Sequence, residues 1–221
     1  MTQPVMFDEY TSIRRLATLV LELGTEADQG RKPGRSFART EILLHAMSVF
    51  NQRGLEDTSV QDLLDAANIS RRTFYKYFSS KLEVLEHIFA LCSRVLIARF
   101  ESELPQTQSR AELIRCMLTI AFDYQFSLGR IIGMMMEEAT RSASPLARHR
   151  LEMQQKLVML LELHLERLGL NVPPQYRLMG LFWAVEGASL QILTQVQDAE
   201  RPRAISECRE QLLVIWDCTL A

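Results

Sequence analysis

Apolar residues recur at steps of three and four along most of this chain. That spacing places them on one face of a helix, whereas the alternating β-branched runs and Asn-Gly turns that mark strands and hairpins are almost absent. The seven prolines lie between the periodic tracts, where they mark helix boundaries. The sequence therefore predicts an all-α protein.

An N-terminal extension is expected before the first regular domain. Residues 7–23 predict an amphipathic helix and residues 24–34 a polar linker. The next tract, 37–52, predicts a helix that ends at Gly54. The apolar face of this helix is expected to contain Ile42, Leu43, Ala46, Val49 and Phe50.

Two short helices with a tight turn between them are predicted next. We expect Thr58 to cap the first, over residues 59–66, and Ser70 to cap the second, over residues 71–77. Asn68 suits the left-handed conformation that a sharp turn requires. Braced by the preceding helix, this arrangement is a helix-turn-helix.

The remainder of the chain predicts long helices. Ser79 or Ser80 is expected to cap one of them. After Pro105 the apolar pattern predicts helices over residues 109–127, 130–141, 146–168, 174–197 and 203–219. Gly180 and Gly187 lie seven residues apart in the second-last helix, where missing side chains allow another helix to approach.

The second short helix carries the candidate chemistry, because in a helix-turn-helix it enters the major groove of DNA. The residues expected to face base edges are Ser70, Arg71, Arg72 and Thr73, and those expected to contact phosphate are Tyr75, Lys76 and Tyr77. Arginine can bond O6 and N7 of guanine, and threonine can touch a thymine methyl. Ile69, Phe74 and Phe78 would hold the helix to its scaffold. The alternative is an exposed basic helix with half-buried tyrosines.

Charge distribution supports a polyanion site. The net charge is −2, yet residues 31–81 hold nine Lys or Arg against five Asp or Glu, which leaves +4 there and −6 elsewhere. A basic module on an acidic body indicates a local site for nucleic acid. The segment leading into the first helix contains Arg31, Lys32, Arg35 and Arg39. We expect a minor-groove or phosphate-binding arm there, or else a solvated linker.

Composition excludes several other classes. The 221 residues are 48% hydrophobic and 24% charged, as in soluble globular proteins, and no apolar run suits a membrane span. The N-terminus lacks a signal-peptide pattern, so a cytoplasmic protein is expected. The four cysteines are scattered and predict buried free thiols, and the four histidines lack metal-ligand spacing. No catalytic constellation, metal site or cofactor motif is found, which argues against an enzyme.

The stretch "TSVQDLLDAANISRRTFYKYFSSKLEVL", residues 58–85, resembles the DNA-binding segment of the TetR/AcrR family of bacterial transcription regulators. The resemblance extends back through "RTEILLHAMSVFNQRGLEDTS". It implies that Tyr75 or Tyr77, and also Lys81, contact phosphates. Two positions depart from the family pattern, since Leu64 replaces a small residue and Asn68 replaces glycine. We also expect Thr58 and Ser59, where the first short helix starts, to contact DNA.

The resemblance further implies a larger helical C-terminal domain that dimerises and encloses an effector pocket. The expected divisions are an extension and linker over 1–34, the helix-turn-helix domain over 35–82, and the effector-binding and dimerisation domain over 83–221. The last two helices would form the dimer interface through Leu181, Val185, Ile192, Leu212 and Trp216. The alternative for these residues is an intramolecular core.

Methionine and aromatic residues in the C-terminal half suit an apolar effector pocket. The residues expected to line it are Phe122, Phe126, Met135 and Trp183, and the alternative is ordinary helical core. The functional hypothesis is a repressor that binds a palindromic DNA operator as a homodimer and is released by a small-molecule effector. Other hypotheses are an activator of the same family, a helical ligand-binding or adaptor protein with a vestigial helix-turn-helix, and a small all-α enzyme.

Overall fold

The computed structural model describes residues 33–221, with side chains described from Arg39 onward. The helix predicted over 7–23 and almost all of the linker predicted over 24–34 lie outside the described residues. Within the described part every regular element is helical, and no strand occurs there. The all-α prediction is confirmed.

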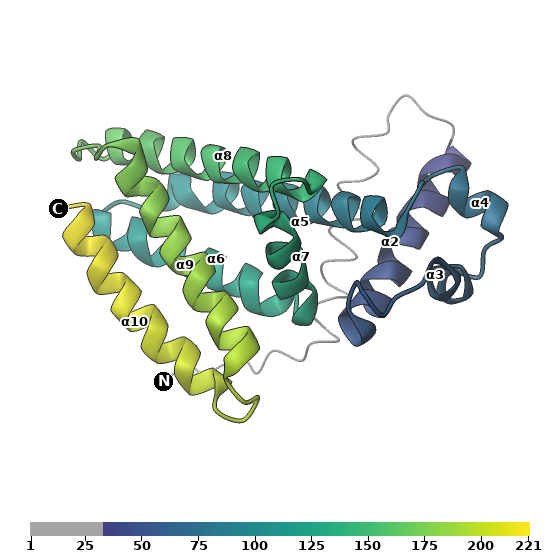
Figure 1. Ribbon diagram of the computed structural model, residues 1–221. Helices are drawn as coiled ribbons and strands as arrows, with labels where there is room; N and C mark the ends of the chain where they lie inside the picture. Colours follow the sequence, from purple (N-terminus) through teal and green to yellow (C-terminus); the bar gives the residue numbers. More distant parts are fainter. Residues whose placement is uncertain (1–32) are drawn as a thin grey trace. The chain divides into compact units, whose positions relative to one another are not determined.

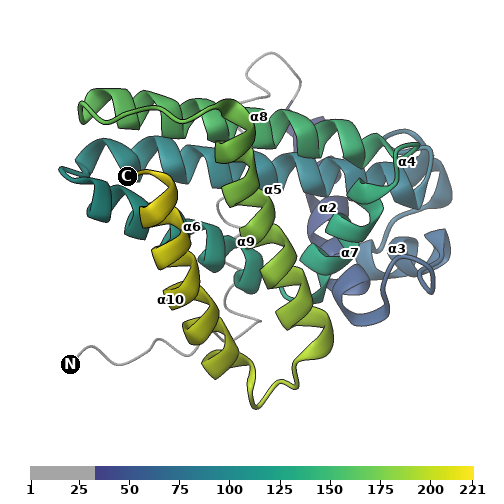
Figure 2. The same cartoon turned by 60° about the vertical axis from the view of Figure 1, so that its left-hand side comes forward.

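The helices follow one another with short connections (Figures 1 and 2). The N-terminal elements are α2 (Pro33–Arg53), α3 (Val60–Ala67), α4 (Arg71–Tyr75) and α5 (Lys81–Glu103), and a 3-10 turn, η1 (Leu104–Gln106), follows them. The later elements are α6 (Arg110–Ser127), α7 (Arg130–Thr140), α8 (Pro145–Arg167), α9 (Gln175–Gln195) and α10 (Arg201–Thr219). The predicted helices after Pro105 therefore agree with the observed ones to within about two residues at each end.

The described chain forms two compact units. The first contains the described residues up to Val95 together with Ser127–Glu138, and the second contains Leu96–Phe126 and Ala139–Ala221. This division differs from the boundary predicted after residue 82. The reason lies in α5, whose helix continues without interruption from the first unit into the second, so no break in the apolar pattern marks the boundary.

The core of the first unit forms where α2 packs against α3. Buried side chains of α2 are Ile42, Leu43, Ala46, Met47 and Phe50. Val49 is only half-buried, and Met47 takes the place that the sequence pattern gave to it. From the following elements Phe74, Phe78, Leu85, Ile88 and Phe89 are also buried. Burial of these large side chains supplies the main stabilisation that such short helices need.

The turn of the helix-turn-helix is built as predicted. Asn68 is left-handed, with φ 50° and ψ 48°, and its N–H is donated to the carbonyls of Asp65 and Leu64. The N–H of Ile69 is donated to the carbonyl of Leu64 at 3.1 Å, which completes a Schellman-type end to α3. Leu64, which stands where the family pattern has a small residue, is almost fully buried, so its larger side chain is packed in the core.

In the second unit α9 packs between α8 and α10, and α6 passes behind α9 in both views (Figures 1 and 2). The rings of Phe182 and Trp216 meet edge to face, with centroids 5.6 Å apart. Glu186 accepts hydrogen bonds from Arg150 and Gln154 and so joins α9 to α8 through a largely buried ion pair. None of the helices in the described part is long and apolar enough to cross a membrane.

A substitution at Asn68 tests this turn. Asn68→Ala is expected to lower the free energy of unfolding by about 1 kcal/mol, because alanine lacks the polar side chain that makes left-handed backbone tolerable. Asn68→Gly should keep or raise the stability, since glycine adopts this conformation without a Cβ clash. Urea denaturation of both variants beside the wild type provides the measurement, and equal losses for the two variants would contradict this account.

Candidate nucleic-acid interface

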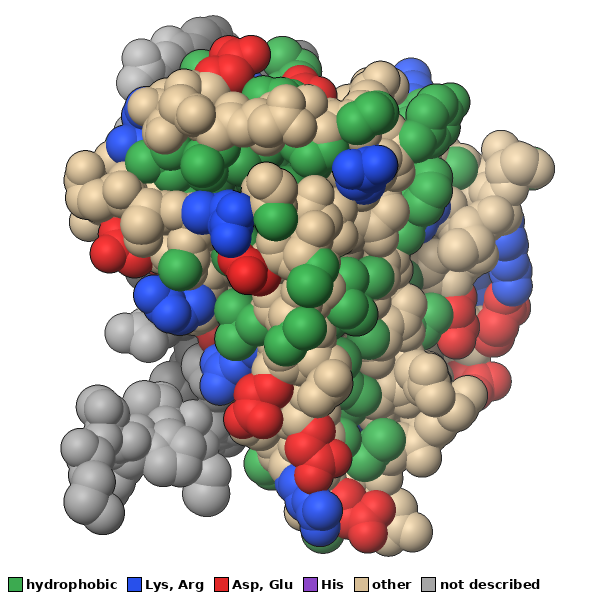
Figure 3. All heavy atoms as spheres, turned by 90° about the vertical axis from the view of Figure 1, so that its left-hand side faces the viewer, with side chains coloured by type: hydrophobic (Ala, Val, Ile, Leu, Met, Phe, Trp, Pro, Cys, Tyr) green, Lys and Arg blue, Asp and Glu red, His purple; other side chains and the backbone are tan. Residues whose placement is uncertain are grey.

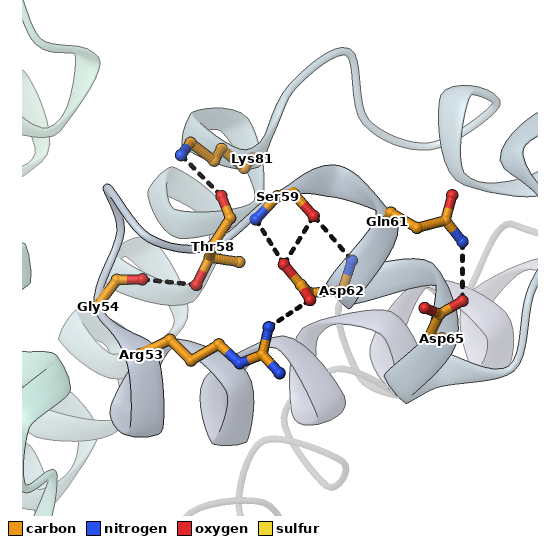
Figure 4. A network of polar contacts seen from close by, with 8 residues as sticks. All are labelled: Arg53, Gly54, Thr58, Ser59, Gln61, Asp62, Asp65 and Lys81. Carbon is orange, nitrogen blue, oxygen red and sulfur yellow. Dashed lines mark hydrogen bonds and ion pairs between the residues drawn. The ribbon is translucent and has the colours of Figure 1, made fainter.

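The first short helix is capped one residue later than predicted. Ser59, rather than Thr58, is the N-cap of α3, and its hydroxyl accepts a hydrogen bond from the N–H of Asp62 at 3.2 Å. The carboxylate of Asp62 accepts in return from the N–H of Ser59 at 2.8 Å and from its hydroxyl at 2.6 Å. This reciprocal arrangement is a capping box. Arg53 also pairs with Asp62 (Figure 4).

Hydrogen bonds from Ser59 and the charge of Arg53 lower the pKa of Asp62. A matching arrangement starts α5. Ser80 accepts from the N–H of Glu83 at 3.1 Å, and the Glu83 carboxylate accepts from the N–H and the hydroxyl of Ser79. Both serines therefore take part, and the bonds from Ser79 lower the pKa of Glu83. Two ionised carboxylates thus hold helix starts on either side of α4.

The connection between α2 and α3 is tied down by two side chains (Figure 4). Thr58 is buried, and its hydroxyl donates to the carbonyl of Gly54 at 2.5 Å. The ammonium of Lys81 donates to the carbonyls of Leu55, Glu56 and Thr58 at 2.7, 3.1 and 2.7 Å. Thr58 and Lys81, both predicted to contact DNA, are therefore engaged inside the unit.

The recognition helix, α4, begins with Ser70, whose hydroxyl accepts from the N–H of Thr73 at 3.1 Å and lies 2.9 Å from the Thr73 hydroxyl. Phe74 is fully buried, and Phe78, three residues beyond the helix end, is almost fully buried as well. These two rings lie 5.9 Å apart and fix α4 on the first unit. The predicted role of both phenylalanines in holding the helix is confirmed by their burial.

The exposed surface of α4 and its C-cap is largely cationic. Its members are Arg71, Arg72, Tyr75 and Lys76, and we call it the outer face of α4. Arg71 and Arg72 form no ion pair or hydrogen bond with any residue in the described part of the chain. Lys76 lies 5.5 Å above the Tyr77 ring, a cation–π contact. Two unpaired guanidinium groups are thus available to an external partner.

The basic arm predicted before this domain is described only in part. The side chain of Arg35 lies outside the described residues. Arg39 belongs to α2, and its Nη2 lies 2.9 Å from Nδ1 of His87, while its guanidinium carbon is 5.8 Å from the centroid of the Phe78 ring. The structure therefore places Arg39 against α5 and the end of the recognition segment, and its contact with DNA stays a prediction.

The predicted dimer residues lie inside the chain. Leu181, Val185, Ile192, Leu212 and Trp216 are all buried within one subunit, with at most 7% of each exposed. They form intramolecular core between α9, α10 and their neighbours, so this assignment is corrected. The pattern of apolar residues identified a buried face and could not show which surface buries it.

The predicted effector residues are not gathered in one unit. Met135 is buried in the first unit, whereas Phe122, Phe126 and Trp183 belong to the second. The rings of Phe122 and Phe126 are neighbours on α6, with centroids 5.7 Å apart. Trp183 is 43% exposed on α9, and its indole N–H points to Gln154 of α8 at 3.5 Å. Trp183 therefore belongs to an outer surface.

The cysteines are free thiols of different exposure. Cys92 is fully buried, and burial raises its pKa to about 12. Cys116 and Cys208 are half-buried, and Cys218 is exposed. The prediction of buried free thiols therefore holds for Cys92 and is wrong for Cys218, which lies on the outward side of α10.

Comparison with known proteins agrees with this geometry. Residues 42–88 match the family model of bacterial regulatory proteins, tetR family. The transcriptional repressor KstR2 of Rhodococcus jostii is 42% identical over 55 residues, which are 25% of this chain and 27% of that protein. The transcriptional activator FasR of Mycolicibacterium smegmatis is 26% identical over 96 residues, 43% of this chain and 44% of that protein. The chain therefore matches less than half of the length of either relative.

A solved structure extends the likeness to the fold. A tetR-family transcriptional regulator from Streptomyces coelicolor superposes with a TM-score of 0.67 at 21% identity, over 82% of this chain and 79% of the other. The fold and the site define a helix-turn-helix protein with a second, helical unit. Residues 42–88 thus match the TetR family of bacterial regulatory proteins, and the fold of the described chain is similar to that of a solved TetR-family regulator.

The two capping carboxylates predict a specific pH dependence. Because the folded-state pKa values of Asp62 and Glu83 lie below their unfolded values, their contribution to stability is present at neutral pH and is lost as the pH falls below about 4. Thermal unfolding midpoints between pH 3 and pH 7 should fall more steeply for the wild type than for the double variant Asp62→Asn, Glu83→Gln. Glu210→Gln, an exposed acid on α10, is the control. Parallel curves for the wild type and the double variant would refute this assignment.

Proposed function

We propose that the protein is a DNA-binding transcriptional regulator, and that it binds a palindromic operator as a homodimer with α4 in the major groove. The observation that carries this proposal is the outer face of α4. Arg71 and Arg72 are exposed there and have no partner in the described part of the chain, whereas Phe74 between them and Tyr75 is buried. A helix held from behind by an aromatic anchor and cationic in front is what groove recognition requires.

The roles within this face follow from reach and chemistry. Arg71 and Arg72 stand at the start of α4, where the recognition helix approaches base edges, and each can form two bonds with guanine. Tyr75 and Lys76, one turn later, are assigned to phosphate. Ser70 and Thr73 bond one another at 2.9 Å, which favours a capping role for them over direct reading of bases.

A second copy of this chain is proposed to cover the outward side of α9 and α10. That side, the outer α9–α10 face, consists of Tyr176, Gly180, Trp183 and Gly187 on α9 and Gln211, Val214, Ile215 and Cys218 on α10. Tyr176 and Val214 are 79% and 59% exposed, which is unusual for such apolar side chains in a core-forming helix pair. Figure 3 shows hydrophobic side chains gathered along this side of the second unit.

The glycine pair supports the same occupant. A Cβ atom added at Gly180 or Gly187 would meet nothing within 4 Å, so no part of the described chain explains the absence of a side chain. Two positions without side chains, seven residues apart on the helix, suit close approach by a helix of another subunit. Two-fold symmetry would then present two α4 helices to the two halves of a palindrome.

Repression with release by a small-molecule effector is the regulatory mode that we propose. The KstR2 relative, matched at 42% identity, is named a repressor. An effector would act by binding the DNA-free arrangement more tightly than the DNA-bound one, because differential affinity alone shifts such an equilibrium. The helix of α5 runs through both units and offers a covalent route between them. FasR is named an activator, so activation is the alternative, and a reporter assay with the regulated promoter distinguishes the two.

The base-reading assignment is tested with DNA selected by the wild type from random duplexes. Arg71→Ala and Arg72→Ala should each weaken binding to this DNA by about 1–3 kcal/mol and relax base preference at one position. Arg115→Ala, an exposed arginine on α6, is the matched control and should bind normally. Mobility shifts provide the measurement, and full affinity in both recognition-helix variants would remove the basis of the proposal.

The dimer face is tested by Gly187→Leu. Leucine is favoured over glycine in a helix by about 1 kcal/mol, and the single chain has open space at this position, so the subunit should remain folded. The added side chain should nevertheless prevent close approach of a second subunit. Light scattering should therefore report the mass of a monomer, with an unchanged helical circular dichroism signal.

The control for this experiment is Met159→Lys, which changes an exposed apolar residue of α8 outside the face. It should associate like the wild type. If Gly187→Leu retained the dimer mass, another surface would have to hold the subunits together.

A further inference from the structure

The ammonium of Lys81 has all its hydrogen-bond partners inside the first unit. Its ammonium lies 2.7 Å from the carbonyl of Leu55, 3.1 Å from that of Glu56 and 2.7 Å from that of Thr58. An ammonium group has three N–H donors, and here each has a carbonyl acceptor. A DNA phosphate could be bound only if one of these three bonds were given up.

The location of Lys81 is also informative. It is the first residue of α5, where the positive end of the helix dipole opposes a cation. Three carbonyl dipoles pointing at the ammonium offset this repulsion. Lys81 is half-buried, so these bonds are stronger than they would be in open water. The arrangement thus stabilises a charge where α5 alone disfavours one.

Through these contacts Lys81 joins the two ends of the helix-turn-helix. The carbonyl of Thr58 immediately precedes the N-cap of α3, and Lys81 immediately follows the connection from α4 to α5. Residues 58–81, which contain both short helices, are therefore fastened to each other at their two ends. Thr58 also fixes the α2–α3 connection, because its buried hydroxyl donates a hydrogen bond to the carbonyl of Gly54.

We propose that Lys81 is a positioning residue, which clamps the α2–α3 connection to the start of α5 and thereby sets α3 and α4 for DNA, without binding phosphate itself. This inference rests on the proposed function. According to this inference, Lys81 raises the affinity for DNA although its ammonium is hydrogen-bonded to three carbonyls of the folded protein. The inference also assigns the same effect to Thr58, a buried and uncharged residue that cannot touch DNA.

Salt dependence separates positioning from phosphate contact. Each phosphate contact that is lost lowers the slope of log K against log salt by about 0.9. Lys81→Met removes the ammonium and keeps most of the stem, and Thr58→Val removes only a hydroxyl. Lys76→Ala, on the outer face of α4, is the reference for loss of a cation assigned to phosphate.

The probe is a duplex that the wild type selects from a random pool, compared with unselected duplex of the same length. Both Lys81→Met and Thr58→Val should weaken binding to the selected duplex by about tenfold, since the first removes the bonds from Lys81 to the α2–α3 connection and the second removes the bond that holds this connection at Gly54. Their salt slopes, and their affinity for unselected duplex, should equal those of the wild type. Lys76→Ala should instead show a smaller slope and weaker binding to both duplexes.

The ratio of selected to unselected affinity is the decisive readout, because a general loss of stability in a protein that stays folded would not change it. A smaller salt slope for Lys81→Met, with normal binding by Thr58→Val, would overturn the inference and make Lys81 a phosphate contact. Unchanged affinity in both variants would overturn it as well. A wild type that selects no duplex would instead overturn the proposed function, and the inference with it.

Discussion

The structure of the recognition segment depends on the burial of two phenylalanines. A helix of five residues cannot persist by its own hydrogen bonds, since helix nucleation is unfavourable and propagation is too short to offset it. Phe74 and Phe78 supply the missing stabilisation from behind, and Phe78 in turn packs edge-on against His87 of α5. The guanidinium of Arg39 covers the same ring. Because the anchor is aromatic and internal, the outer face of α4 is left to cations.

Several acidic residues of this domain bind groups inside it, and none of them pairs with Arg71 or Arg72. Asp62 completes a capping box and pairs with Arg53, Asp65 accepts from Gln61 at 2.8 Å, and Glu83 receives the N–H of Ser79. The outer face of α4 thus presents three cations, Arg71, Arg72 and Lys76. Because the carboxylates of Asp62 and Glu83 are used at the starts of α3 and α5, they do not neutralise the cations on the exposed surface of α4.

Much of this architecture could be predicted from the sequence, because apolar periodicity, prolines and capping residues are local signals. Helix ranges after Pro105 and the left-handed Asn68 follow from such signals. The N-cap was misplaced by one residue, since Thr58 and Ser59 are both good capping residues and only the return bond from Asp62 decides between them. The partners of Lys81 could not be predicted at all. Main-chain carbonyls have no identity in the sequence, so only the folded connection reveals them.

The same limit explains the misassigned interface. A helix such as α9 carries two apolar faces, and the more regular one, with Leu181 and Val185, is the one that pattern analysis selects. That face is buried in the subunit's own core, so its regular apolar spacing is explained by folding and not by association. The outward face is irregular, mixing Tyr176 and Trp183 with glycines. Its glycines become informative only when the space around each missing Cβ is known. Since a Cβ at either glycine would meet nothing in the described part of the subunit, folding does not require these glycines, and this supports the proposed association through the outward face.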